Sequence, residues 1–567
     1  MRSVADWYDR NRKSIWLCIV LNLLLLLIYL LLMRPVFDSN DDMNIAFFVN
    51  RARPVQDPYL LFENVLLGHV CGFLYRVTNM LPWYGLLQYF GLFSAFTAMT
   101  WVIQQLFSTA GASALSLILL NFFAADAYIQ MQFTKTAGVC AACGLCLVVY
   151  AMTRRHVHRI ALLFGVLINL YGYLYRDREA YVMIALWCVL GFGLLLRLNE
   201  EKAGRRLHRA QAYFACLFLV AVVCAGAWAF NKVSYKMNPE ASAYKAVNDV
   251  RSDITDYGFP DYAKNRELFD SLRISANAYK LFSKWNFYDP DVYTLSVQEK
   301  ILEAQPGREL NMQLVRDFLD KYPYKWFENP MFYCFLTMTV LVLLYGKRDW
   351  KMWLTLVLLI LALTGVFFIM YWNGRYNLQR VDSPIWLCAC LVLLFLTDPE
   401  RFVLPARFTL TLVLVLLVLN QDNWRENWRH NTLKAAQKMA ASANIAAQAS
   451  QDTEHLYLSK VGLYTLSTGY GPLSLVPVGV GANTCSLGGW PAGSPSYCAV
   501  LKSFGIENPY RDCINNDKVY LIDNHIDWTM NYIHEYYDPD AQEEVIGTFG
   551  EDTMYRIVSK KTPQSNP

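Results

Sequence analysis

Charged side chains are scarce in this sequence, and neither sign of charge dominates. Asp, Glu, Lys and Arg make up 17% of the 567 residues, against about 25% in soluble domains, while apolar residues make up 55%. The 51 basic residues nearly balance the 47 acidic ones, which leaves a formal charge of +4. The balance indicates no nucleic-acid partner and no acidic tail. With a mean hydropathy of +0.21, the chain is expected to be a membrane protein and not a single soluble globule.

Cysteine is also sparse, and two common classes of site are missing. Fourteen Cys in 567 residues are too few for a disulfide-built scaffold. No Gly-rich loop of the dinucleotide or P-loop type precedes a basic helix, which argues against ATP-driven transport. No pair of His residues has the spacing of a zinc site.

Long apolar runs are abundant, and a helix needs about 20 such residues to cross the bilayer. The first run has no small-residue cleavage site behind it, so we interpret it as a retained anchor. Several of the later runs are short, and neighbouring ones can be merged. We expect about eleven spans, near residues 14–33, 82–107, 110–125, 136–152, 160–175, 180–196, 213–230, 331–345, 353–371, 384–396 and 402–419.

Basic residues predict the orientation of these spans. With the N-terminus in the cytoplasm, alternation of the spans places five basic clusters on the cytoplasmic side, as the positive-inside rule requires. These clusters lie in residues 10–13, 154–159, 197–209, 347–351 and 401–407. The polar remainder then faces outward: residues 34–81, the short loops around Asp126, Arg176 and Arg375, the insert 231–329 and the tail after 420. The expected location is the plasma membrane, with the C-terminal region outside the cytoplasm.

The predicted fold is a polytopic α-helical membrane protein with an outer insert and a small C-terminal domain. Residues 1–420 form the membrane domain, in which 231–329 alternate turn formers with helical periodicity. Residues 421–567 predict an α/β domain of about 140 residues, large enough to hold its own core. Its expected elements are helices at 432–450 and 526–537 and strands at 456–458, 519–522 and 554–558. One disulfide is expected among Cys485, Cys498 and Cys513, with Cys485 to Cys498 closing the shortest loop.

Three carboxylates stand close together directly after the first span, at Asp38, Asp41 and Asp42. Neighbouring carboxylates beside a low-dielectric membrane repel one another, which raises at least one pKa and suits a general base or a pair that binds a divalent cation. The alternative is an ordinary polar loop in which Asn40 or Asp41 caps the helix that starts near Met43.

The segment after these acids favours the first interpretation. Apolar residues recur at helical spacing through residues 43–77, which predicts helices lying along the membrane surface. A first span, an acidic motif and surface helices in this order resemble the GT-C superfamily of integral-membrane glycosyltransferases, of the bacterial type that uses polyprenyl-phosphate-linked sugars. The resemblance is to the architecture of the membrane half and not to a sequence signature.

The resemblance implies an activity and roles for residues. A polyprenyl-phosphate-linked sugar is the donor, and an inverting displacement transfers the sugar on the outer face to a glycan, lipid or protein acceptor. Asp41 or Asp42 is the candidate base, supported by Asp38, with a divalent cation at Asp41 and Asp42 as an open alternative. The lack of a nucleotide loop fits a lipid-phosphate donor. The candidate phosphate-binding residues are Arg176, Arg178, Lys135, Arg375 and Arg380.

Each of these cations has a simpler explanation, because basic residues at span ends often extend to lipid headgroups. Their grouping in short outer loops, where the positive-inside rule predicts few basic residues, favours a site. In the C-terminal domain, Trp490 and Tyr497 are expected to be exposed aromatics that bind an acceptor glycan. Two other functions stay open: a polysaccharide polymerase or ligase acting on lipid-linked glycan, which needs no acidic motif after the first span, and a non-catalytic transporter or scaffold.

Overall fold

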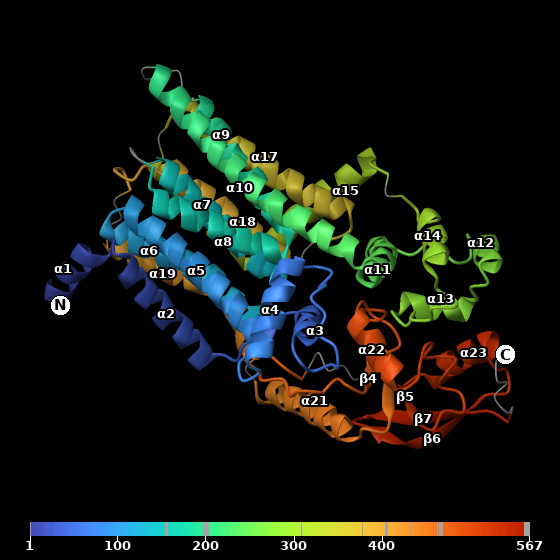
Figure 1. Ribbon diagram of the computed structural model, residues 1–567. Coiled ribbons are helices and arrows are strands. Elements are labelled where there is room, and N and C mark those ends of the chain that lie inside the picture. Colours follow the sequence, from blue (N-terminus) through green and yellow to red (C-terminus); the bar gives the residue numbers. More distant parts are fainter. Residues whose placement is uncertain are drawn as a thin grey trace.

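The structure, a computed structural model, has two parts: a long bundle of helices and a lobe at one end of it (Figure 1). We call this part the outer lobe, after the orientation that the basic residues predict. It describes residues 2–153, 157–196, 203–307, 309–346, 348–376, 378–402, 406–430, 432–461, 463 and 469–560. Arg154, Arg155, Arg197, Lys202 and Lys347, which belong to the basic clusters used to predict the orientation, lie outside the described residues.

Each of the eleven apolar segments expected from the sequence contains a helix. The bundle comprises α2 (Ile15–Leu32), α5 (Trp83–Leu106), α6 (Thr109–Ile129), α7 (Phe133–Thr153), α8 (Arg159–Tyr175), α9 (Asp177–Leu196), α10 (Ala203–Met237), α16 (Pro330–Tyr345), α17 (Trp350–Trp372), α18 (Gln379–Leu396) and α19 (Ala406–Leu419). A short helix, α1 (Arg2–Asn11), precedes them. Their apolar side chains form one continuous core, in which α7 is enclosed on all sides.

Fewer of these helices qualify as spans than the sequence predicted. Among the described residues, seven are long and apolar enough to cross a membrane: α2, α5, α6, α7, α10, α17 and α18. An eighth span is counted if α15 (Met312–Glu328) and α16, which meet at an angle of 91°, are taken as one. The chain is therefore a multi-pass helical membrane protein with seven or eight candidate spans, and the expected count of eleven is not confirmed. The helix α8 is too short, and over their described residues neither α9 nor α19 is among the helices that qualify.

The first outer loop is held against the bundle by a short pair of parallel strands. β1 (Val36–Phe37) pairs with β2 (Gln130–Met131), which lies between α6 and α7. α3 (Asn40–Val49) and α4 (Val65–Val77) follow. α3 begins at Asn40, three residues earlier than expected, and its N-cap residue Ser39 makes no side-chain capping bond. The interpretation of Asn40 or Asp41 as a helix cap is therefore wrong.

The outer lobe is built from two distant stretches of sequence. The insert supplies α11 (Pro239–Tyr257), α12 (Arg266–Ser271), α13 (Ala276–Ser283) and α14 (Leu295–Glu303). The C-terminal stretch supplies α21 (Leu433–Gln451), α22 (Pro495–Ser503), α23 (Ile526–Tyr536) and a five-stranded sheet. Buried side chains from both stretches form one apolar core. Between bundle and lobe, α20 (Gln421–Arg429) packs against α6, where Trp424 Nε1 donates to Asn121 Oδ1 (2.9 Å).

The sheet has the order β4-β3-β5-β7-β6. Its strands are β3 (Leu456–Ser459), β4 (Thr484–Ser486), β5 (Val519–Asp523), β6 (Gln542–Phe549) and β7 (Asp552–Val558). β3 runs parallel to both of its neighbours, whereas β7 runs antiparallel to β5 and β6. The chain passes from β3 to β4 on one side and then to β5 on the other, so the carboxyl end of β3 is a topological switch point, the usual place for a ligand in such sheets.

Candidate active site

A cavity of about 700 Å³ opens where the bundle meets the outer lobe. Its walls come from the first outer loop, the start of α7, the α8–α9 and α17–α18 junctions, α11, and the carboxyl ends of β3 and β4. These segments are far apart in sequence, and the alternation of spans predicted that all of them face the same side. Six arginines and three carboxylates line the cavity: Arg53, Arg176, Arg178, Arg251, Arg375, Arg380, Asp41, Glu179 and Asp256.

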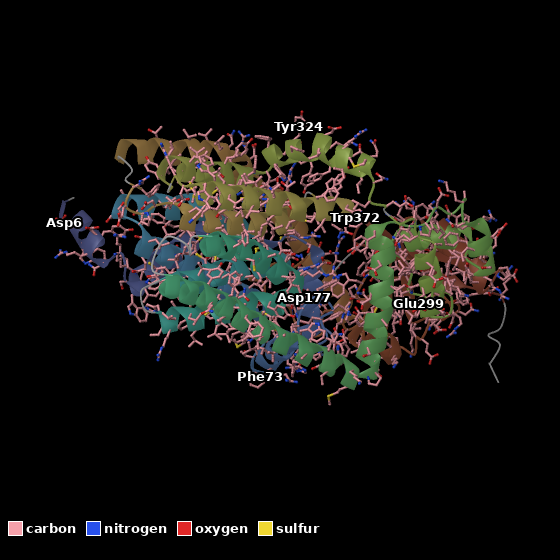
Figure 2. All side chains as sticks on the ribbon, turned by 90° about the horizontal axis from the view of Figure 1, so that it is seen from above. Asp6, Phe73, Asp177, Glu299, Tyr324 and Trp372 are labelled. Atoms are coloured by element: carbon pink, nitrogen blue, oxygen red, sulfur yellow. The ribbon has the colours of Figure 1, made fainter. Side chains whose placement is uncertain are left out.

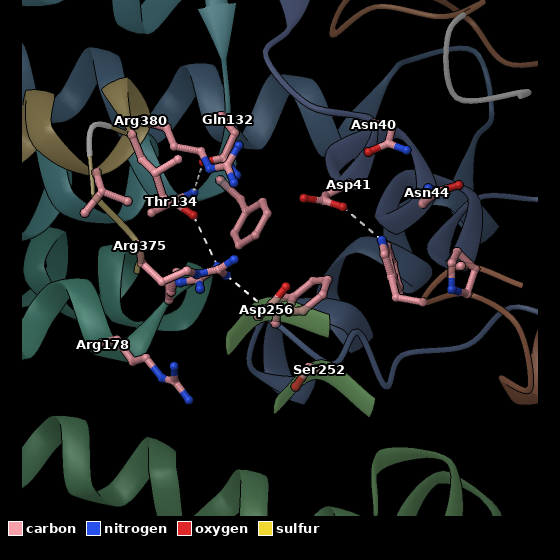
Figure 3. A pocket seen from close by; sticks show the side chains of 18 of the residues that line it. Asn40, Asp41, Asn44, Gln132, Thr134, Arg178, Ser252, Asp256, Arg375 and Arg380 are labelled. Atoms are coloured by element: carbon pink, nitrogen blue, oxygen red, sulfur yellow. Dashed lines mark hydrogen bonds and ion pairs between the residues drawn. The ribbon is translucent and has the colours of Figure 1, made fainter. Parts of the chain in front are cut away.

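Asp41, in the first turn of α3, is the acid of the first outer loop that reaches the cavity. Trp490 Nε1, from the outer lobe, donates a hydrogen bond to its Oδ1 (2.9 Å), and Ser39 Oγ donates to its Oδ2 (3.3 Å). The side chain is half-buried. Figure 3 shows its carboxylate on one side of the cavity and Arg178, Arg375 and Arg380 on the other. A carboxylate held in this way is fixed in direction while it stays open to a ligand.

Asp42 points away from the cavity into the core, so the structure does not place it with Asp41. Its Oδ1 accepts hydrogen bonds from Gln88 Nε2 (2.8 Å), Tyr84 Oη (3.2 Å) and the Phe133 amide (3.0 Å). Tyr84 Oη also donates to Glu63 Oε1 (2.6 Å). Burial raises the pKa of Asp42, and likewise that of Glu63, well above the usual range. This network ties α3 to α5 and α7.

Asp38 also lies outside the cavity lining. Its side chain is exposed, and its amide continues the β1–β2 pairing by donating to the Met131 carbonyl (2.9 Å). The structure therefore does not bring the three acids together. Among the described residues, no group of three or more His, Cys, Asp or Glu side chains is arranged to hold a metal ion.

Four of the five predicted phosphate-binding residues line the wall formed by the bundle. We call Arg176, Arg178, Arg375 and Arg380 the bundle-side arginines. Arg176 Nη1 donates to Thr134 Oγ1 (3.3 Å), and its guanidinium lies over the Phe133 ring (5.3 Å). Burial lowers the pKa of Arg176, and the charge of Glu179 opposes that shift. Arg375 pairs with Asp256 (3.0 Å). Because four guanidiniums face two carboxylates, Glu179 and Asp256, this wall keeps an excess of positive charge.

Lys135, the fifth predicted phosphate-binding residue, does not reach the cavity. Its ammonium is 1% exposed, forms an ion pair with Asp126 (3.0 Å) and donates to the Gln130 carbonyl (2.8 Å). A cation that is buried and already neutralised cannot meet a phosphate in the cavity. Lys135 lies in the first turn of the enclosed helix α7, which explains the difference from the prediction.

The opposite wall of the cavity contains three functional candidates that the sequence did not reveal: Arg53, Arg251 and Trp285. They lie there with Trp490, beside the carboxyl ends of β3 and β4. The positive-inside rule could have indicated Arg53, because the residue lies in an outer loop. Arg251 belongs to a helix with many other charges, so its position gave no such indication.

Two expectations for the C-terminal region are wrong. Trp490 is 7% exposed and Tyr497 is fully buried, so neither is an exposed aromatic. Trp490 lines the cavity instead, while Tyr497 packs in the core and donates to the Ser486 carbonyl (2.6 Å). Cys485, Cys498 and Cys513 are free thiols in the structure, so the expected disulfide is not formed.

Two solved structures resemble the chain over nearly its whole length. ArnT from Cupriavidus metallidurans bound to undecaprenyl phosphate is 12% identical with a TM-score of 0.39, over 95% of this chain and 97% of that one. The apo state of ArnT from the same organism is 13% identical, with a TM-score of 0.39 over 98% of both chains. No protein-family model and no curated protein matches the sequence.

Proposed function

We propose that the protein is a membrane glycosyltransferase that moves a sugar from a polyprenyl-phosphate-linked donor to a cell-envelope acceptor on the outer face of the membrane. One observation is the basis of this proposal: Asp41 and the four bundle-side arginines, drawn from three distant segments, line one cavity at one end of the bundle. The reaction itself comes from the GT-C resemblance of the first outer loop, and the outward direction comes from the distribution of basic residues.

The geometry fits an inverting displacement. Asp41 removes the proton of an acceptor hydroxyl, whose oxygen then attacks the anomeric carbon of the donor sugar. The bond from that carbon to the phosphate oxygen breaks, and the lipid phosphate leaves with the extra negative charge. Guanidinium groups bind phosphate oxygens in a bidentate way and stabilise that charge, which is the role we assign to the bundle-side arginines. The bonds from Trp490 and Ser39 keep Asp41 oriented.

The first test is the identity of the bound lipid. Native mass spectrometry of the whole protein, released from its own membranes, is expected to find a polyprenyl phosphate or its sugar conjugate. Arg176→Gln and Arg375→Gln should each reduce the bound fraction, because each removes a cation from the cavity wall. An exposed arginine of the outer lobe gives the matched control, Arg266→Gln. A chain that copurifies with no lipid phosphate contradicts the donor assignment.

The second test concerns the base. Asp41→Asn should lower the rate of transfer from the identified lipid by about 10²–10⁴-fold, the usual contribution of a general base, while lipid binding and membrane abundance stay normal. Asp527→Asn, an exposed acid in α23, is the control. Unchanged transfer by Asp41→Asn would support a polymerase or ligase instead, because that reaction uses the arginines without the acid.

A further inference from the structure

The six arginines of the cavity fall into two groups. The charges that act most strongly on Arg176 are those of Glu179, Arg178, Arg375 and Arg380, all on the bundle wall. The charges that act most strongly on the pKa of Arg251 are instead those of Asp256, Tyr244 and Asp41. Tyr244 Oη donates to the Trp490 carbonyl (2.6 Å). The charges of both Arg251 and Arg53 act on the pKa of Tyr244. Both arginines line the cavity beside residues of the lobe: Arg53 Nη1 donates to Ser496 Oγ, and the Arg251 guanidinium lies over Trp285. Arg53 and Arg251 therefore form a second cationic group on the lobe side of the cavity.

Both members of this second group are buried without a carboxylate partner. Arg53 is 9% exposed and Arg251 is 3% exposed. Among the described residues, neither forms an ion pair within 4.0 Å, although the charge of Asp57 reaches Arg53 from farther away. Arg53 Nη1 donates to Ser496 Oγ (3.4 Å), and its buried Nε has no partner. Burying a guanidinium is costly unless it is paired, so two such groups on one cavity indicate an anionic ligand.

Arg251 is held in place by several contacts. Arg251 donates to Asn248 Oδ1 (2.5 Å) and Thr255 Oγ1 (3.2 Å), and its guanidinium lies over the ring of Trp285 (4.8 Å). Trp285 has a φ of +68°, a left-handed conformation that is unusual for a bulky residue and is one of the strained conformations that cluster at functional sites. Its carbonyl accepts a hydrogen bond from the Gly489 amide (2.9 Å), which joins the insert to the loop after β4.

The sheet of the lobe contributes its ligand-binding edge to the same wall. Ser459 and Val461, at and after the end of β3, line the cavity together with Cys485 and Ser486 at the end of β4. This is the topological switch point of the sheet, where parallel strands present their carboxyl ends to ligands. The lobe-side group is therefore built into a second binding surface, which faces the bundle-side arginines across the cavity.

We propose that this second surface binds the acceptor, and that the acceptor carries a carboxylate or phosphate group held by Arg53 and Arg251. The inference rests on the proposed function, because it assigns the donor phosphate to the bundle side. A phosphate at the membrane surface reaches the arginines at the ends of the spans. The lobe-side group is left for the other substrate, whose sugar ring would contact Trp285 and Trp490.

Three small sugars of matched size test this inference: glucose, glucuronate and glucose 6-phosphate. Isothermal titration at constant ionic strength would use the full chain in nanodiscs that contain a polyprenyl phosphate, so that the bundle side is occupied. At least one anionic sugar is expected to bind at least tenfold more tightly than glucose. The tighter of the two identifies the anionic group as a carboxylate or a phosphate. Equal binding of all three sugars would overturn the inference.

Variants then locate the bound anion. Arg53→Gln and Arg251→Gln should each weaken binding of the preferred anionic sugar at least tenfold, with binding of glucose unchanged. Arg251→Lys keeps the charge and loses the fork geometry of the guanidinium, so its loss of affinity for the anionic sugar should be smaller than that of Arg251→Gln. Binding that is retained in Arg251→Lys also shows that the fold is intact. Arg266→Gln, on the same lobe, is the control. Loss of binding in Arg375→Gln but in neither lobe-side variant would overturn the assignment.

These binding measurements do not depend on catalysis. If an anionic sugar binds through Arg53 and Arg251 while Asp41→Asn leaves transfer unchanged, the lobe-side site stands and the glycosyltransferase proposal fails. If Asp41→Asn abolishes transfer while no sugar is preferred over glucose, the enzyme proposal stands and the anionic acceptor fails.

Discussion

Asp41 and Asp42 are neighbours in the sequence, yet their side chains have different surroundings, and we expect them to have different roles. Asp42 Oδ1 accepts three hydrogen bonds inside the protein, while among the described residues Oδ2 has no hydrogen-bond partner. Burial raises the pKa of Asp42, which favours the protonated, uncharged carboxyl. An amide has the same shape and is also uncharged. We therefore expect Asp42→Asn to fold and to transfer sugar nearly as the wild type does.

Removal of the whole carboxyl group should be costly. Asp42→Ala leaves the Gln88 amide and the Phe133 N–H buried without an acceptor, and each such loss destabilises by about 1–3 kcal/mol. Thermal unfolding of the two variants in detergent measures the difference. If Asp42→Asn loses activity while it retains stability, Asp42 and not Asp41 is the base.

At the same scale, charge, topology and the GT-C resemblance together predicted the candidate site residues. Arg176 and Arg375 were found because they stand in short outer loops where the positive-inside rule predicts few cations. Lys135 was selected by the same argument, but the ion pair with Asp126 depends on how α6 and α7 pack, which no local pattern reveals. Arg251 and Trp490 were missed as cavity residues because the insert and the tail meet only in three dimensions.

At the scale of elements, the loop after β4 depends on close backbone approach. A Cβ at Gly488 would lie 1.8 Å from the Trp285 carbonyl oxygen and 2.8 Å from its carbon. Both are backbone atoms, so no side-chain rotation can relieve the clash. We expect Gly488→Ala to displace the loop, to weaken the bond from Trp490 to Asp41, to lower transfer and to destabilise by about 1–3 kcal/mol.

Gly547→Ala provides the matched control for this loop. Its added Cβ would meet only the flexible end of Met554, at 3.8 Å. Thermal unfolding and transfer should both stay near wild type in this variant. Wild-type transfer by Gly488→Ala would mean that the position of Trp490 has no influence on Asp41.

The periodicity of the sequence predicted some elements of the lobe and not others. The helix expected at 526–537 is α23, and the strands expected at 456–458, 519–522 and 554–558 are β3, β5 and β7. β6 was missed because it is an edge strand exposed along most of its length, so it shows no alternation of apolar and polar residues. β4 has only three residues within a Gly-, Pro- and Ser-rich stretch, where pairing with β3 and not local preference makes the strand.

At the scale of the whole molecule, the proposal requires the cavity to face outward. Figure 2 shows Asp6 and Glu299 at opposite ends of the molecule, and both side chains are exposed. In intact cells, a membrane-impermeant maleimide should label Glu299→Cys and leave Asp6→Cys at the background of the wild-type cysteines. The basic clusters are the physical reason, since they hold the α1 end in the cytoplasm. Labelling of Asp6→Cys alone would place the cavity inside the cell.

The outer lobe should also fold as one unit, although its two stretches are far apart in sequence. Phe269, Phe282 and Tyr293 of the insert share a core with Tyr497 and Tyr532 of the C-terminal stretch, and the rings of Tyr293 and Tyr532 stack with centroids 6.2 Å apart. Exposure of one large apolar side chain costs about 1.5–3 kcal/mol. A few such losses equal the whole stability of a typical domain, about 5–15 kcal/mol.

The tail is large enough for a core of its own, as the sequence indicated, but the core observed in the structure is completed by the insert. We therefore expect residues 432–560 alone to lack a cooperative thermal transition, measured by near-ultraviolet circular dichroism. The same residues joined through a flexible linker to 239–307 should regain one, because the linker restores the missing half of the core. A sharp transition in the isolated tail would show that the two stretches are independent domains that merely touch. The lobe-side wall of the cavity would then be a contact between two separate bodies and not a rigid surface.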